Sequence, residues 1–166
     1  KVLEPNNDLI RATHKNIGEA YFRLGQHSRA EEHNRKALEF AEKYSGTSSL
    51  NYAYSCNNMA ITLEQLVRYE EALSLMLKAK QIISDSLGVE DEHYATNCYN
   101  LGSLYYSIGQ YEEAEPLYRE AREIYQTIYG LNHLEYIEAV NHLGRFYLDI
   151  GKFSLADSLF QEIDAY

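Results

Sequence analysis

The feature that most constrains the fold is a repeat with a period of 42 residues. Four segments, which start at Leu9, Asn51, His93 and Glu135, align with one another without a gap. Two aligned columns contain only small residues, namely Gly18, Ala60, Gly102 and Gly144 in the first and Ala30, Ala72, Ala114 and Ala156 in the second. A fixed period of this length is typical of solenoids, in which each unit packs against its neighbours. The function of such a chain is therefore a property of the surface that the array presents.

Each repeat is predicted to form two helices, a first (A) helix and a second (B) helix. In the repeat that starts at His93, apolar residues recur at the spacing of an amphipathic helix over about 94–107 and again from Ala114 to Ile128. Gly109 should end the A helix in a left-handed conformation, and Gly130 should end the B helix. The columns of glycine and alanine should let the two helices approach closely, because larger side chains would overpack the contact.

The charge balance excludes several classes of partner. The chain has 25 acidic and 15 basic residues and a formal net charge of −10. Surfaces that bind nucleic acids or anionic membranes usually contain clusters of Lys and Arg, so neither is an expected partner. No apolar run approaches the ~20 residues that a membrane-spanning helix needs. The expected partner is therefore a protein or a peptide.

The two cysteines, Cys56 and Cys98, occupy the same place in adjacent repeats. Neighbouring helix axes lie about 8 to 10 Å apart, which is too far for a disulfide unless the backbone moves. We therefore interpret both cysteines as small buried hydrophobic residues. This interpretation fits a reducing compartment, and we expect a cytoplasmic location.

The sequence contains no motif that indicates catalysis, a cofactor or a metal. His27 and His33 are six residues apart on one predicted helix and should lie on different faces, so they do not form a zinc pair. No H-E-x-x-H motif, glycine-rich phosphate loop or G-x-S-x-G motif is present. We therefore expect no enzymatic activity, no cofactor and no metal.

The aligned columns resemble the tetratricopeptide repeat over residues 9–166. Each copy has an apolar residue followed by Gly or Ala, and an alanine twelve positions later. The 42-residue period, the segment Glu112–Tyr118 and the loop Gly130–His133 are similar to the kinesin-light-chain type of repeat. Three positions depart from the pattern: Val67 replaces a turn glycine, Asn34 replaces an aromatic residue, and Leu134 replaces a proline. The resemblance implies an all-α, right-handed superhelical solenoid of about four helix-turn-helix repeats.

The resemblance also implies where a ligand would bind. In tetratricopeptide arrays the A helices line a concave groove, and fixed positions of each A helix face into it. Carried over to this chain, the predicted groove residues are Lys15, Asn16, Phe22, Tyr54, Asn57, Asn58, Tyr99, Asn100, Tyr106, Asn141, His142 and Arg145.

Three of these residues, Asn16, Asn58 and Asn100, form one column, in which His142 takes the fourth place. Asparagine is unfavourable within a helix, because its amide competes with the backbone for hydrogen bonds. One interpretation is a ladder of carboxamides that binds the main chain of an extended peptide. The alternative is that these amides brace neighbouring helices. The aromatic groove residues could likewise anchor a ligand or pack on the next A helix.

The resemblance, together with the residues above, leaves three functions open. The first is a protein-interaction module that binds an extended peptide in the groove. The second is a scaffold that self-associates through the apolar side chains of the last helix, Leu159, Phe160, Ile163 and Tyr166. The third is a regulatory arm of a larger signalling protein or CHAT-type peptidase. We expect the chain to be an excerpt, in which residues 1–8 are the tail of a preceding repeat and the repeats span 9–50, 51–92, 93–134 and 135–166.

Overall fold

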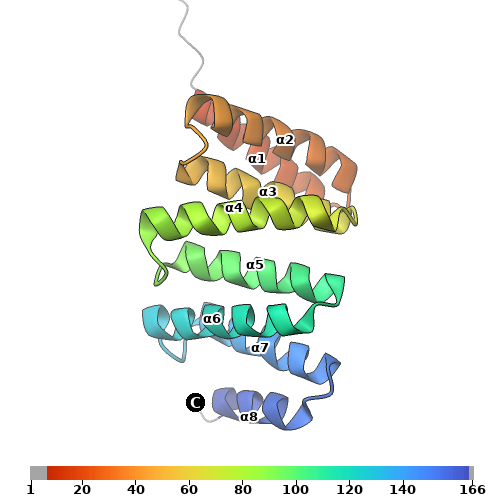
Figure 1. Ribbon diagram of the computed structural model, residues 1–166, viewed down its shortest axis with the longest axis vertical. Coiled ribbons are helices and arrows are strands. Elements are labelled where there is room, and N and C mark those ends of the chain that lie inside the picture. The colour runs from red at the N-terminus through yellow and green to blue at the C-terminus, as the bar shows by residue number, and fades with distance from the viewer. Residues whose placement is uncertain (1–6, 165–166) are drawn as a thin grey trace, which may run out of the picture. The chain divides into compact units, whose positions relative to one another are not determined.

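The structure, a computed structural model, describes residues 7–164, which form α-helices and no strand (Figure 1). The helices are α1 (Asn7–Arg23), α2 (His27–Tyr44), α3 (Leu50–Gln65), α4 (Tyr69–Leu87), α5 (Glu92–Ile108), α6 (Tyr111–Tyr129), α7 (Leu134–Asp149) and α8 (Phe153–Asp164). Each predicted repeat contains one A helix and one B helix, so the all-α prediction is confirmed. Residues 1–6 of the predicted tail and Tyr166 lie outside the described residues.

The chain divides into two compact units, Lys1–Ser86 and Leu87–Tyr166, which we call the N-terminal and C-terminal units. In the N-terminal unit α1 and α2 form a hairpin, and α3 packs against both of them. In the C-terminal unit α5 pairs with α6, α7 packs against α6, and α8 pairs with α7. The C-terminal unit therefore contains two consecutive hairpins, and the N-terminal unit begins with one hairpin against which α3 packs.

Helix ends follow local sequence signals. The side chain of Asp91 accepts a hydrogen bond from the backbone N–H of His93 at 2.8 Å, which starts α5 two residues before the predicted 94–107. Helix α6 begins at Tyr111, whereas apolar periodicity marked its start only at Ala114. The turn that the prediction missed contains Glu112 and Glu113. Their negative charges favour a helix N-terminus, but both side chains are exposed and so do not contribute to the apolar periodicity.

The turns between A and B helices need a left-handed residue. Gly109 has a φ angle of 85°, as predicted, and Gly25 and Gly151 have φ angles of 70° and 76° in the equivalent turns. Val67 occupies the equivalent turn after α3 with a φ of 61°. A β-branched residue with positive φ is a genuine outlier, so this turn is strained.

The two columns of small residues form the contact between paired helices. Ala30, Ala72, Ala114 and Ala156 are each 0% exposed. A Cβ atom added at Gly102 would lie 3.3 Å from the ring of Tyr118, and one added at Gly144 would lie 2.5 Å from the ring of Phe160. The prediction that these positions allow close helix packing is therefore confirmed.

Both cysteines are free and fully buried, which confirms their interpretation as small hydrophobic residues. Burial raises the pKa of the Cys56 thiol to about 11, so this thiol stays protonated at neutral pH. Within residues 7–164, the helices are all too short or too polar to cross a membrane.

Candidate functional site

The N-terminal unit contains a hollow of about 410 Å³ between the A helices α1 and α3, over the B helix α2. Its lining residues are Lys15, Glu19, Phe22 and Arg23 of α1, Asn34 of α2, and Asn58, Ile61 and Thr62 of α3. Three predicted groove residues, Lys15, Phe22 and Asn58, are therefore brought together. A volume of this size lies within the ordinary range of ligand pockets, ~300 to 1,000 Å³.

Asn34 forms the floor of this hollow and is only 4% exposed. Its Nδ2 donates to Oγ1 of Thr62 at 2.9 Å and to the carbonyl oxygen of Asn58 at 3.3 Å. The amide fits because position 18 is glycine: a Cβ atom there would lie 2.2 Å from Oδ1 of Asn34. Sequence reasoning noted Asn34 only as a departure from an aromatic column. The signal that could have placed Asn34 in the site is the combination of a polar residue in the aromatic column of the B helix and a glycine, Gly18, in the small-residue column of the A helix.

The rim of the hollow carries charge. Glu19 and Arg23 form an ion pair at 2.6 Å on the surface of α1. Lys15 is half-buried and makes no ion pair with the acidic residues of the described chain. Its ammonium group is therefore available to an anionic or hydrogen-bond-accepting group of a ligand.

The C-terminal unit contains a second hollow, of about 250 Å³, between α5 and α7. Its lining residues are Tyr99, Ser103, Tyr106, Tyr118, His142, Arg145, Phe146 and Asp149. Four of them, Tyr99, Tyr106, His142 and Arg145, were predicted. Aromatic rings form most of the wall, and the ring of Tyr118 packs against those of Tyr99 and Phe146 at centroid distances of 5.8 and 5.4 Å.

Two polar contacts cross this second hollow. The Tyr106 hydroxyl donates to Oδ2 of Asp149 at 2.9 Å, and this hydrogen bond raises the pKa of Tyr106. The Tyr99 hydroxyl lies 3.1 Å from Nδ1 of His142, with ring centroids 4.7 Å apart. Desolvation lowers the pKa of His142, so the imidazole is neutral at neutral pH and can both donate and accept.

The remaining predicted residues differ in accessibility. Asn57 is only 8% exposed, which makes it the predicted residue least able to reach a ligand, and Tyr54 is half-buried. Asn16 and Asn141 are exposed, and Asn100 is half-buried. Within residues 7–164, the carboxamides of Asn16, Asn58, Asn100 and Asn141 have no hydrogen-bond partner. Because the asparagine column extends over both units, its alignment stays a prediction.

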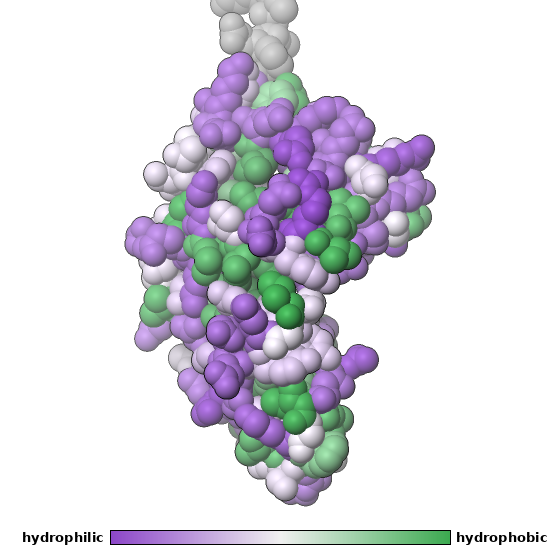
Figure 2. All heavy atoms as spheres, turned by 45° about the vertical axis from the view of Figure 1, so that its right-hand side comes forward, coloured by the Kyte–Doolittle hydropathy of each residue, from purple (hydrophilic) through white to green (hydrophobic). Residues whose placement is uncertain are grey.

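Neither hollow has the ligands of a metal centre. Throughout the described part of the chain, no group of three or more His, Cys, Asp or Glu side chains is placed to hold a metal ion. Figure 2 shows hydrophobic side chains in small groups between hydrophilic ones on one face of the molecule. Exposed large apolar residues come from separate elements, for example Leu24 at 68% and Phe153 at 66%.

Several solved structures share this fold. BtubC (BKLC) from P. vanneervenii superposes with a TM-score of 0.86 at 23% identity, over 99% of this chain and 66% of that one. A putative kinesin light chain from Podosopora anserina with nearly identical TPR-like repeats gives a TM-score of 0.87 at 20% identity, over 98% of this chain and 76% of that one. A Rap protein complexed with competence and sporulation factor gives 0.84 at 22% identity, over 97% of this chain and 43% of that one.

Sequence comparison gives the family. No curated protein sequence matches the chain. Models of the tetratricopeptide repeat match residues 16–50, 49–127 and 95–163. These matches cover most of the chain, and the structure has the alternating A and B helices of such repeats. The chain therefore belongs to the tetratricopeptide repeat family.

Proposed function

We propose that this chain is a protein-interaction module that binds an extended peptide or partner segment in the hollows lined by its A helices. Membership of the tetratricopeptide repeat family supports the general role, because this fold is generally a non-catalytic interaction scaffold. One structural relative is a Rap protein complexed with competence and sporulation factor, which supports a ligand of the peptide or protein class.

The observation that carries the proposal is the hollow of about 410 Å³ in the N-terminal unit. It combines the apolar side chains of Phe22 and Ile61 with the unpaired Lys15 and the carboxamide of Asn58. Such a mixture of apolar area and a few polar groups is typical of ligand sites. An extended peptide offers alternating side chains for the apolar walls and main-chain groups for the amide and ammonium groups.

The free carboxamides support the ladder interpretation over the bracing alternative. A bracing amide would be hydrogen-bonded to a neighbouring helix, as Asn34 is to Thr62. The amide of Asn58 lines the hollow instead, and only its main-chain oxygen receives hydrogen bonds, from Asn34 and Thr62. Replacing the Asn58 side chain should therefore leave these internal contacts intact.

The experiment selects ligands from a displayed library of random peptides on the wild-type chain and measures their affinity by fluorescence polarisation. The double substitution Lys15→Ala with Asn58→Ala should weaken binding by about tenfold, since each lost hydrogen bond contributes about 0.5 to 1.5 kcal/mol. The melting temperature should not fall, because alanine is the better helix former.

The matched control is Asn132→Ala in the exposed loop before α7, which should leave affinity unchanged. Unchanged affinity in the double variant would show that the peptide binds elsewhere. A parallel loss of melting temperature and affinity would favour the bracing role of Asn58.

Self-association through α8 is a second candidate, favoured by the exposure of Phe153 at 66% and Leu155 at 46%. The predicted contact residues Leu159 and Phe160 are half-buried and pack against the core of the C-terminal unit, which reduces their availability. Light scattering over a range of concentrations tests this candidate, since a constant monomer mass at high concentration contradicts it. A regulatory role within a larger signalling protein or CHAT-type peptidase stays an alternative.

A further inference from the structure

Two histidines meet between α1 and α2. His14 of α1 and His33 of α2 have their Nδ1 atoms 3.0 Å apart and their ring centroids 5.2 Å apart. Both residues are half-buried. Sequence reasoning examined only His27 and His33, because they share one helix. The partner of His33 comes instead from the other helix of the hairpin, nineteen residues earlier in the chain.

The distance between the two nitrogens matches a pair of adjacent ligands on one metal ion. With metal–nitrogen bonds of about 2.0 to 2.1 Å, a separation of 3.0 Å corresponds to an angle of about 91 to 97° at the metal. This angle is close to the 90° of tetragonal or octahedral ions and well below the ~109° of tetrahedral zinc. Imidazole nitrogens in tetragonal geometry favour Cu²⁺ and Ni²⁺.

Aromatic side chains hold both rings in place. Phe40 stacks against His14 with a centroid distance of 6.2 Å, and Tyr21 packs against His33 at 5.6 Å.

Lys36, a cation near the pair, is partly compensated. Nζ of Lys36 lies 2.7 Å from a carboxylate oxygen of Glu32, one turn earlier on α2. This ion pair reduces the repulsion that Lys36 would exert on a metal ion at the two rings. The carboxylate of Glu32 also adds negative charge near the pair.

We propose that His14 and His33 form a binding site for a divalent transition-metal ion of the Cu²⁺ or Ni²⁺ class, with both Nδ1 atoms as ligands and water at the remaining positions. In the metal-free pair one Nδ1–H donates to the other Nδ1. On binding, the proton of the donor ring moves from Nδ1 to Nε2 through solvent, so that each neutral ring carries its one hydrogen on Nε2 and no net proton is released. The bound ion ties α1 to α2 directly beside Lys15 and Asn34, which line the N-terminal hollow.

Calorimetric titration of the tag-free chain with Ni²⁺ tests the site. We expect one ion per chain, and His14→Gln or His33→Gln should weaken binding at least ~10-fold, since even outer partners of metal ligands contribute 10- to 100-fold. His93→Gln is the matched control, because it removes an exposed imidazole of the C-terminal unit and should leave affinity unchanged. Equal affinity in all three variants overturns the proposal.

Two spectroscopic measurements use the wild-type chain and need no variant. The electron paramagnetic resonance spectrum of the chain with one equivalent of Cu²⁺ should show coupling to two imidazole nitrogens. Substoichiometric Ni²⁺ should broaden the imidazole proton resonances of His14 and His33 before those of the other four of the 6 histidines. Broadening that begins at another histidine, or a copper spectrum with fewer than two nitrogens, contradicts the site.

Discussion

The two units fill the same place in the helix hairpin with different side chains. In the C-terminal unit the rings of Tyr118 and Phe160 lie over Gly102 and Gly144. In the N-terminal unit the amide of Asn34 lies over Gly18. All three contacts occur at the same position of the 42-residue repeat. The two units therefore share the same helix hairpin and differ in the B-helix side chain that fills this position beneath the A helices.

This difference changes the hollow above it. Where Asn34 forms the floor, the hollow measures about 410 Å³, and where Tyr118 does, it measures about 250 Å³ and is walled by aromatic rings. Asn34 also directs its amide to Thr62 and to the main chain of Asn58, so the wider hollow has a polar floor. The residue at this place in the repeat thus differs together with the size of the hollow, while the fold stays the same.

The largest effect on stability is expected when Tyr118, the floor residue of the C-terminal unit, is replaced by the asparagine that forms the floor in the N-terminal unit. Tyr118→Asn should lower the free energy of unfolding by ~3 to 5 kcal/mol, because removing a buried ring leaves a cavity. Tyr118 is 7% exposed and belongs to the main hydrophobic cluster of this unit. Chemical denaturation followed by circular dichroism measures the change.

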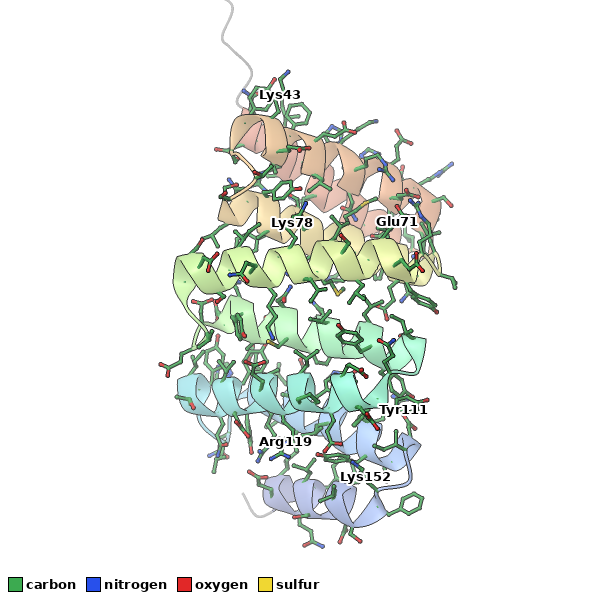
Figure 3. The ribbon with its side chains drawn as sticks, in the orientation of Figure 1. Lys43, Glu71, Lys78, Tyr111, Arg119 and Lys152 are labelled. Carbon is green, nitrogen blue, oxygen red and sulfur yellow. The ribbon has the colours of Figure 1, made fainter. Side chains whose placement is uncertain are left out.

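The control is Tyr111→Asn at the exposed start of the same helix, where Tyr111 is labelled in Figure 3 and is 46% exposed. This substitution should have a much smaller effect, because less of the ring leaves a packed environment. Similar losses for the two variants would show that the floor position has no special role in the C-terminal unit.

The reverse exchange should act on binding more than on stability. Asn34→Tyr places a ring over Gly18, and we expect it to fill the N-terminal hollow and lower the affinity for a selected peptide by at least tenfold, ~1.4 kcal/mol. The lost hydrogen bond to Thr62 contributes about 0.5 to 1.5 kcal/mol, which the buried ring should offset. Fluorescence polarisation and thermal melting separate the two effects. Unchanged affinity with normal melting would place the peptide outside this hollow.

The repeat period made the fold predictable from the sequence. Four copies of the repeat predict the same helix hairpin, so a departure in one copy, such as Asn34 or Leu134, does not obscure the pattern. Helix ends were less predictable, because caps and first turns depend on single polar residues such as Asp91 and Glu112. The periodic signal comes from buried apolar positions and is weak where a helix begins in solvent.

The site was predictable only for residues on the A helices. Their facing positions follow from helix geometry and the family pattern, and Lys15, Phe22 and Tyr99 do line hollows. Asn34 of the B helix α2 was missed. Thr62 and Asp149 were also missed, although they lie on the A helices α3 and α7, because they fall outside the facing positions of the family pattern and their place in the hollows depends on how side chains of different helices meet. The pairing of His14 with His33 was missed for the same reason, since it joins two helices and has no spacing signature.

A smaller effect is expected at the turns between A and B helices. Val67 has a φ of 61° in the N-terminal unit, whereas the C-terminal unit has Gly109 at 85°. Val67→Gly should raise the free energy of unfolding by ~0.5 to 1 kcal/mol, because relief of left-handed strain of about 1 to 2 kcal/mol exceeds the entropy that glycine loses on folding. Denaturant unfolding measures the shift. Val89→Gly, at an exposed loop position whose own φ is not positive, is the control and should destabilise instead. A loss of stability in both variants would show that Val67 is not strained.

The smallest expected effect concerns an ion pair of the C-terminal unit. A carboxylate oxygen of Glu115 lies 2.6 Å from Nζ of Lys152, which is labelled in Figure 3, and the other accepts a hydrogen bond from Tyr147 at 3.0 Å. The hydrogen bond from Lys152 lowers the pKa of Glu115 below its ordinary value of 4.5, although desolvation opposes it and Tyr147 assists. A carboxyl group whose pKa is lower in the folded state contributes stability above its unfolded pKa and loses that contribution as the pH falls through the folded value.

Glu115→Gln should therefore reduce the free energy of unfolding at pH 7 by less than ~1 kcal/mol, because Lys152 is largely solvated. The difference between variant and wild type should shrink as the pH falls below 4.5. Denaturant titrations at pH 7, pH 4.5 and pH 3 test this, with Glu112→Gln at an exposed position of the same helix as the control. A difference that stays constant over this range would mean that Glu115 acts through packing, and the charge of the pair would then have no part in joining α6 to the start of α8.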